Sequence, residues 1–250
     1  GEAHVLDVQK APRKQNLHTI KLNFGELKLN DKVFAKIDTA RRQQITTNHS
    51  SAHLLQSALK KIVGNHIQQA GSYVSDEYMR FDFTHFEKVS DAQIKAIEQL
   101  VNQNIFAKQA VTFEYMPIEE AKASGAMALF SEKYDSVVRV VTMGDFSKEL
   151  CGGCHVRNTQ EMGLFKIVSE ESIGSGIRRI TAKTGLSAYH DFLGYQNQLE
   201  SIASLYKANS FHKIEDRVNL SLEELSETKQ QLGKEKKKVA NMEAKLLKTE

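Results

Sequence analysis

The sequence has no apolar run long enough to span a bilayer, and its first residues lack the apolar core of a signal peptide. It has no Walker loop for nucleotide phosphates and no nucleophile elbow of the hydrolase type. Internal repeats and low-complexity segments are absent too, which excludes a repeat array. We therefore expect a cytoplasmic protein that has no membrane partner and no ATP-dependent ligase site in this chain.

The sequence has few cysteines and a small net charge. Only two of the 250 residues are cysteines, Cys151 and Cys154, and both lie in "KELCGGCHVR". In a reducing compartment, thiols spaced C-x-x-C are more often metal ligands or redox groups than a structural disulfide. The formal net charge of +3 gives weak support for a polyanionic partner.

The periodicity of the sequence predicts an α+β fold in three parts. Residues 1–38 alternate in "HVLDVQK", "LHTIKLNF" and "KVFAKID" and are predicted to form a small N-terminal β-barrel. Residues 39–185 mix helical and strand periods and are predicted to form a central α+β domain with an antiparallel sheet. Residues 186–250 are predicted to form a long helix or a helical hairpin.

The central region begins with a predicted helix, "TARRQQITTNHSSAHLLQSALKKIVG", in which His49 and His53 share one face. In "YMRFDF", alternation predicts a half-buried strand with its apolar side chains on one side. Ser90 and Gln93 form a capping-box pair at the start of a second helix. "GSGIRR" is typical of a tight hairpin turn between two more strands.

The last part carries a heptad stripe that indicates a marginal coiled coil. The repeating apolar positions are Val218, Leu225, Leu232, Val239 and Leu246, whereas the companion row is largely polar. Such a stripe needs a partner helix, so a homodimer through this region is one expectation, and a solvated charged helix is the other. Because the sequence stops in mid-pattern, we expect a piece of a longer protein.

Two pairs of residues form a candidate metal site. His49 and His53 are four apart on the predicted helix, so both imidazoles can face one ion. Cys151 and His155 form a C-x-x-x-H pair far along the chain. Because Zn²⁺ accepts both thiolate and imidazole, these four residues suit a zinc site that ties the helix to the loop.

The same loop permits other interpretations. "CGGCH" matches the attachment pattern of c-type haem, which requires a secretory route, and C-x-x-C alone matches a thioredoxin-like redox pair. Alternatively, Cys151 and Cys154 are both zinc ligands and His155 lies outside the first shell. For the zinc site, Gly152 and Gly153 are expected to let the backbone turn sharply enough to present both ligands inward, whereas two glycines would make a poor helix start for a thioredoxin-like pair.

Several long motifs occur in the order found in one family. They are "NHSSAHLL", "GSYVSDEYMRFDF", "GAMALFSEKYDSVVRVVTMGDFSKELCGGCHV" and "GLFKIVSEESIGSGIRRITAKTG". Together they resemble the editing region of alanyl-tRNA synthetase, a module also found in free-standing editing proteins and in threonyl-tRNA synthetase. The resemblance covers nearly the whole chain, with a β-barrel before the editing domain and a helix leading to an oligomerisation domain after it.

The resemblance implies hydrolysis of Ser-tRNA or Gly-tRNA mischarged on tRNA(Ala), with the acceptor end as the bound part. The family's zinc ligands fall on His49, His53, Cys151 and His155. This chain has Cys154 where the family usually has threonine, and we expect that thiol to lie beside the site without binding the metal. A tRNA-binding and dimerising fragment without catalysis is the alternative function.

The resemblance also implies roles for residues outside the metal site. Gln69 matches a glutamine associated with editing, and Ser50 or Ser51 is expected to replace a family threonine that recognises the hydroxyl of serine. Arg80 and Asp82 lie on the polar side of their predicted strand and are expected to line the cleft. Arg178 and Arg179 are the candidates for contacts with the tRNA backbone, where phosphate contacts give affinity without sequence information.

Overall fold

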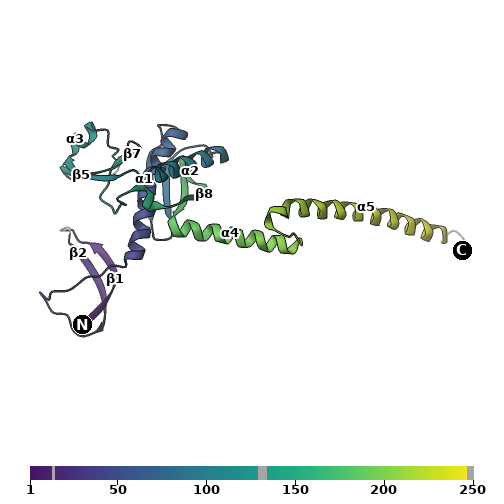
Figure 1. The fold of residues 1–250 in the computed structure, drawn as a ribbon, viewed down its shortest axis with the longest axis horizontal. Helices are drawn as coiled ribbons and strands as arrows, with labels where there is room; N and C mark the ends of the chain where they lie inside the picture. The colour runs from purple at the N-terminus through teal and green to yellow at the C-terminus, as the bar shows by residue number, and fades with distance from the viewer. Residues whose placement is uncertain (13–14, 129–133, 247–250) are drawn as a thin grey trace. The chain divides into compact units, whose positions relative to one another are not determined.

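The structure is a computed structural model that describes residues 1–12, 15–128 and 134–246 (Figure 1). The chain separates into two compact units, Gly1–Asp38 and Thr39–Glu250. Each unit is described by itself below.

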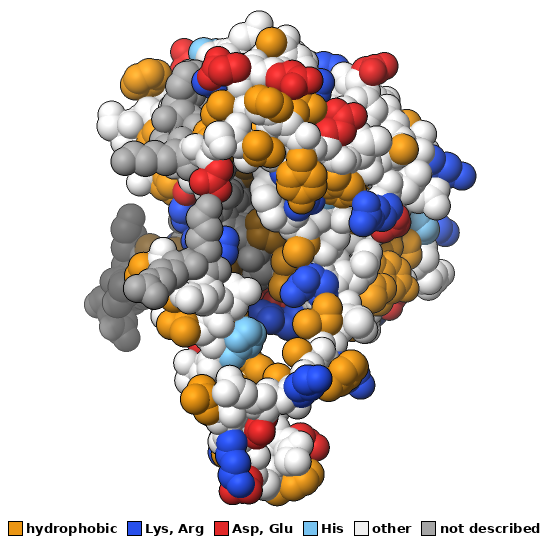
Figure 2. All heavy atoms as spheres, turned by 90° about the vertical axis from the view of Figure 1, so that its left-hand side faces the viewer, with side chains coloured by type: hydrophobic (Ala, Val, Ile, Leu, Met, Phe, Trp, Pro, Cys, Tyr) orange, Lys and Arg blue, Asp and Glu red, His pale blue; other side chains and the backbone are white. Residues whose placement is uncertain are grey.

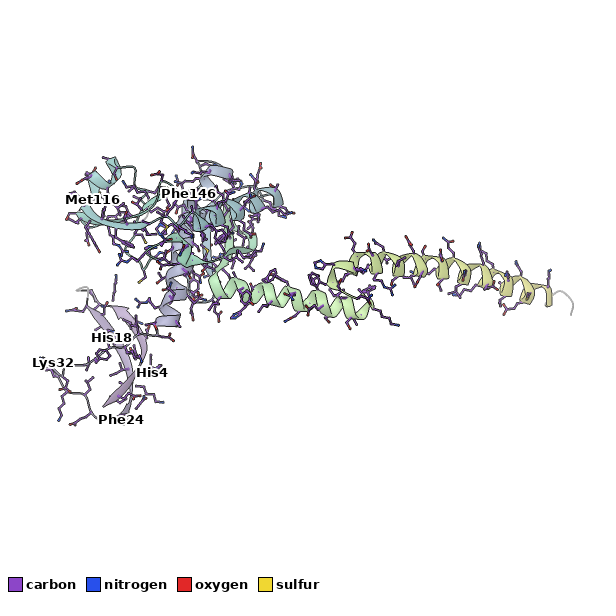
Figure 3. The ribbon with its side chains drawn as sticks, viewed as in Figure 1. His4, His18, Phe24, Lys32, Met116 and Phe146 are labelled. Carbon is purple, nitrogen blue, oxygen red and sulfur yellow. The ribbon has the colours of Figure 1, made fainter. Side chains whose placement is uncertain are left out.

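The first unit is a two-stranded antiparallel sheet of β1 (Glu2–Lys10) and β2 (Asn16–Phe24). His4 and His18 come from these two strands (Figure 3). The predicted third strand, "KVFAKID", is wrong, since this segment has no regular secondary structure and Phe34 is 92% exposed. The predicted barrel is not confirmed, because two strands cannot close on themselves around a core.

The second unit contains two antiparallel sheets, which confirms the α+β class. The larger sheet has the order β3-β4-β9-β8, formed by Gln69–Val74, Met79–Thr84, Ile177–Thr184 and Phe165–Gly174. The smaller sheet has the order β5-β6-β7, formed by Val111–Pro117, Val137–Met143 and Ser147–Leu150. The turn between β8 and β9 is the predicted hairpin, and Gly176 has a φ of 69° in it, a conformation that favours glycine.

Helices join these sheets. The α-helices are α1 (Thr39–Ile62), α2 (Asp91–Phe106), α3 (Ile118–Ala123), α4 (Gly185–Leu205) and α5 (Ile214–Leu246), with short 3₁₀ segments at Thr159–Met162 and Phe211–Lys213. The capping box of Ser90 and Gln93 opens α2 as predicted. Helix α1 packs against α2, β4, β9 and β7, so it touches both sheets.

The core fixes α1 in place. Met79, Phe81 and Phe83 of β4 are fully buried, which confirms the predicted alternation in that strand. They belong to one cluster with apolar residues of α1 and α2, namely Leu54, Leu55, Leu59, Ile97, Val101 and Ile105. Burying a side chain of this size stabilises the fold by roughly 1.5–3 kcal/mol. The helix that carries two candidate ligands is therefore held by packing, independently of any ion.

Helices α4 and α5 end the described chain. The apolar stripe of α5 is exposed, with Leu225, Leu232 and Val239 each about half exposed, and the side chain of Leu246 lies outside the described residues. The predicted homodimer through this stripe remains a prediction. A search of the described helices finds none whose length and hydropathy would let it cross a membrane.

Candidate metal centre

Four side chains converge where α1 meets the loop that follows β7. His49 and His53 lie on one face of α1, as their four-residue spacing predicted, and Cys151 and His155 come from the loop. One ligand atom from each residue can be chosen so that all four lie within 4.8 Å of one another. The structure thus brings together the four residues that the sequence singled out.

The thiol of Cys151 lies among the imidazoles. Its Sγ is 3.3 Å from Nε2 of His155 and 3.5 Å from Nε2 of His49. The ring centroid of His155 lies 4.4 Å from that of His49 and 4.6 Å from that of His53. Because one thiolate and three imidazoles are all donors for borderline-soft ions, the set suits a divalent transition metal in a four-coordinate shell.

Burial and charge pairing set the protonation of the cluster. Burial alone would raise the pKa of the Cys151 thiol, but hydrogen bonds from His155, His49 and His53 lower it to about 3. Burial alone would lower the pKa of His53, but the carboxylate of Glu149 and the thiolate raise it to about 10. Without an ion, the thiolate and the His53 imidazolium therefore coexist at neutral pH.

Burial and neighbouring histidines keep His155 neutral, and Ser50 orients its ring. Burial and the nearby His53 and His49 lower the pKa of His155 to about 4, against the thiolate of Cys151. The Ser50 hydroxyl donates to the carbonyl oxygen of Thr46 at 2.8 Å and lies 3.2 Å from Nδ1 of His155. The ring nitrogen on the opposite side, Nε2 of His155, faces the cluster, 3.3 Å from Sγ of Cys151.

Glu149 is a buried carboxylate beside the cluster that the sequence analysis did not single out. Its carboxylate is buried, with Oε2 3.0 Å from Nδ1 of His53, although the ring N–H does not point straight at it. Ser147 lies 3.2 Å from the other carboxylate oxygen. The signal was available in "SKELC", because alternation along β7 places Glu149 on the same side as Cys151.

Gly153 matters for a reason other than the predicted sharp turn. Neither Gly152 nor Gly153 has a positive φ, so their freedom to adopt left-handed conformations is not what the loop uses. A Cβ at position 153 would lie 2.5 Å from Nδ1 of His49 and would overlap Cε1 of the same ring, whereas a Cβ at 152 meets nothing within 4 Å. Glycine at 153 therefore lets the loop approach the imidazole closely.

Cys154 lies outside the group of four ligands. Its thiol is exposed and lies 3.6 Å from Nη1 of Arg42. The group of four donors contains His155 and not Cys154. That the thiol of Cys154 sits beside the site without binding the metal remains a prediction.

The other candidate residues have partners inside the protein. Ser51 is fully buried and donates to the carbonyl oxygen of Asn48 at 2.8 Å. Gln69 lies at the start of β3, opposite Phe83, and is not part of the ligand group. Contacts between substrate and either serine or Gln69 remain predictions.

The charged residues of the large sheet form ion pairs. Arg179 binds Asp82 through two hydrogen bonds of 2.7 and 2.8 Å, and buried Arg178 binds Glu170 in the same two-point manner. Arg80 lies over the ring of Tyr73, with its guanidinium carbon 4.7 Å from the ring centroid. The guanidinium groups of Arg178 and Arg179 already have anionic partners, and their predicted contacts with tRNA remain untested.

The sequence is similar to those of known aminoacyl-tRNA synthetases. Residues 138–181 match the family described as "Threonyl and Alanyl tRNA synthetase second additional domain". The chain is 46% identical over 244 residues to the alanine–tRNA ligase of Halalkalibacterium halodurans and 50% identical over 244 residues to that of Exiguobacterium sibiricum. Each alignment covers 98% of this chain and 28% of the relative, so the chain spans little more than a quarter of their length.

Proposed function

We propose, from the chain's membership of the alanine–tRNA ligase family, that it hydrolyses the ester of tRNA(Ala) mischarged with serine or glycine. The relatives support a role in tRNA aminoacylation or its editing. The observation that carries the finer proposal is the four-ligand cluster, because Cys151 and His155 fall inside the segment matched to the synthetase domain. The proposed place of action is the cytoplasm, where tRNA is charged.

Zinc is the proposed ion. His49, His53, Cys151 and His155 would hold it, and Nε2 of His155 already faces the cluster. When bound, zinc supplies a positive charge beside the ester. Because four protein ligands fill a tetrahedral shell, we assign the site a role in positioning the terminal adenosine or aminoacyl group, with polar side chains holding the attacking water.

A hydrolytic site of this kind is needed because an amino-acid pocket alone discriminates poorly between alanine and similar amino acids. A pocket that accepts alanine cannot reject glycine or serine strongly by size, since one small group is worth only about 1–3 kcal/mol. A second site that destroys the wrong product restores accuracy.

The test is deacylation of purified Ser-tRNA(Ala) by the chain, with zinc measured in the same preparation. We expect hydrolysis well above the uncatalysed rate and one zinc per chain. Binding of tRNA without hydrolysis would favour the alternative, a non-catalytic module that dimerises through the exposed stripe of α5.

Replacing Glu149 by glutamine is expected to weaken zinc binding by about 10–100-fold, as is usual when an outer carboxylate partner of a ligating histidine is removed. The amide keeps the shape but loses the charge that faces Nδ1 of His53. Competition against a coloured chelator measures the affinity. Glu171→Gln, at an exposed position, is the matched control, and equal affinities for the two variants would contradict the assignment.

Zinc binding to the metal-free chain is expected to release about one proton per ion near neutral pH. The pKa of His53 is raised to about 10, so this imidazole keeps its proton below that pH and must lose it to coordinate. The thiolate of Cys151 and neutral His155 need no such change. Apparent affinity should rise about tenfold per pH unit between about pH 7 and pH 8. Calorimetry in buffers of different ionisation enthalpy measures the released proton, and a flat pH profile would disprove this protonation scheme.

A further inference from the structure

Three arginines adjoin the loop that carries two of the metal ligands. Nη1 of Arg42 lies 3.6 Å from Sγ of Cys154, and Nη1 of Arg139 donates to the carbonyl oxygen of Gly152 at 3.3 Å. Arg157 follows His155 by two positions. Within the part of the chain that the structure describes, none of the three forms an ion pair with a carboxylate.

Phe113 holds two of these arginines beside the metal centre. The guanidinium carbons of Arg139 and Arg157 lie 4.6 and 4.8 Å from the centroid of its ring. The same ring lies 6.5 Å from that of His155. Contact with an aromatic face orients a guanidinium group without using its N–H donors, so the two groups keep donors for an anion.

Two arginines of the large sheet differ in this respect. Arg178 forms an ion pair with the carboxylate of Glu170, and Arg179 forms one with the carboxylate of Asp82, so the N–H donors of these contacts are already used. On the face shown in Figure 2, side chains of both signs are interspersed with hydrophobic ones, so no broad basic area is visible there. Arg42, Arg139 and Arg157 instead place positive charge locally, at the loop that carries Cys151 and His155.

We propose that Arg42, Arg139 and Arg157, here named the basic rim, bind backbone phosphates of the terminal nucleotides of an RNA whose 3′ end enters the metal centre. Guanidinium groups form charge-assisted, often two-point hydrogen bonds with phosphate, and such contacts position a nucleic acid without reading its sequence. The identity of the ligand rests on the proposed function. The basic rim takes the role that the sequence alone gave to Arg178 and Arg179.

The test compares binding of uncharged tRNA(Ala) transcript to the 250-residue chain and to its Arg139→Gln/Arg157→Gln variant, by fluorescence anisotropy over a series of KCl concentrations. We expect roughly tenfold weaker binding for each arginine removed, since hydrogen bonds to charged groups are worth that much. The slope of log affinity against log salt should fall by about one for each lost phosphate contact.

Matched variants separate the basic rim from charge and folding effects. Arg42→Gln changes an exposed side chain at the start of α1 and should also weaken binding, whereas Arg217→Gln on α5 loses the same charge and should not. Arg157→Lys should retain most of the salt slope. Zinc content should be unchanged throughout, since none of these residues is a ligand.

The basic rim would be overturned if the double variant and Arg42→Gln both bound tRNA with the affinity and salt slope of wild type. It would also be overturned if Arg217→Gln lost as much affinity as the rim variants. Hydrolysis of Ser-tRNA by the wild-type chain is measured separately. Hydrolysis together with unaffected binding in the variants removes only the basic rim. Weakened binding in the variants together with no hydrolysis by wild type removes only the proposed function.

Discussion

Replacing His53 by alanine is expected to remove the bound zinc and to lower the rate of Ser-tRNA(Ala) deacylation by well over a hundredfold. Loss of an outer partner of a metal ligand already costs about 10–100-fold, and loss of the ligand itself should exceed that. His53 is buried, and its ring centroid lies 5.6 Å from that of His49 and 4.6 Å from that of His155. Zinc analysis and a deacylation time course measure the two effects.

The matched control for this prediction is His66→Ala. His66 is an exposed histidine that contacts His85 at 3.0 Å and takes no part in the ligand group. It should leave zinc content and hydrolysis unchanged. Retention of both zinc and full activity in His53→Ala would remove the central assignment, whatever the control shows.

Replacing Gly153 by alanine is expected to displace the His49 imidazole and to produce an effect nearly as large. The new methyl group would overlap that ring, and the ring is a ligand that cannot move aside without leaving the ion. We expect zinc affinity to fall by at least the roughly 10–100-fold seen for outer-shell changes. Competition with a chelator gives the affinity, and spectra of a cobalt-substituted form report the altered ligand set.

Gly152→Ala is the neighbouring control. A Cβ there meets nothing within 4 Å, and the backbone φ is not in the left-handed region. Its expected effect on zinc is small, because the only change is one methyl group pointing into open space. Similar losses in both variants would mean that loop flexibility, rather than contact with His49, explains the two glycines.

The sequence predicted the two pairs of the candidate metal centre because the rules that form each pair are local. Residues four apart on a helix share a face, which is enough to pair His49 with His53, and the C-x-x-x-H spacing is enough to pair Cys151 with His155. The hairpin of β8 and β9 and the capping box of α2 were predictable for the same reason, since each depends on a few neighbouring residues.

Features that depend on contacts between distant segments were not predictable. The need for glycine at 153 arises from a ring more than a hundred positions earlier, and no local pattern reports it. The ion pair of Arg178 with Glu170 depends on the register of two strands, which the sequence did not give. Alternation in "KVFAKID" predicted a strand, but alternation cannot supply the neighbouring strand that it would need.

The two halves of the metal centre differ in what supports them. Leu54, Leu55 and Leu59 anchor α1 in the core just beyond His53, whereas Cys151 and His155 are carried by a segment without regular structure. A chelator should therefore leave the helical content and cooperative melting of the chain largely intact while the loop gains freedom. In this respect the chain should contrast with small zinc fingers, which unfold when stripped of metal, and a single preparation should cycle between loaded and stripped forms without refolding.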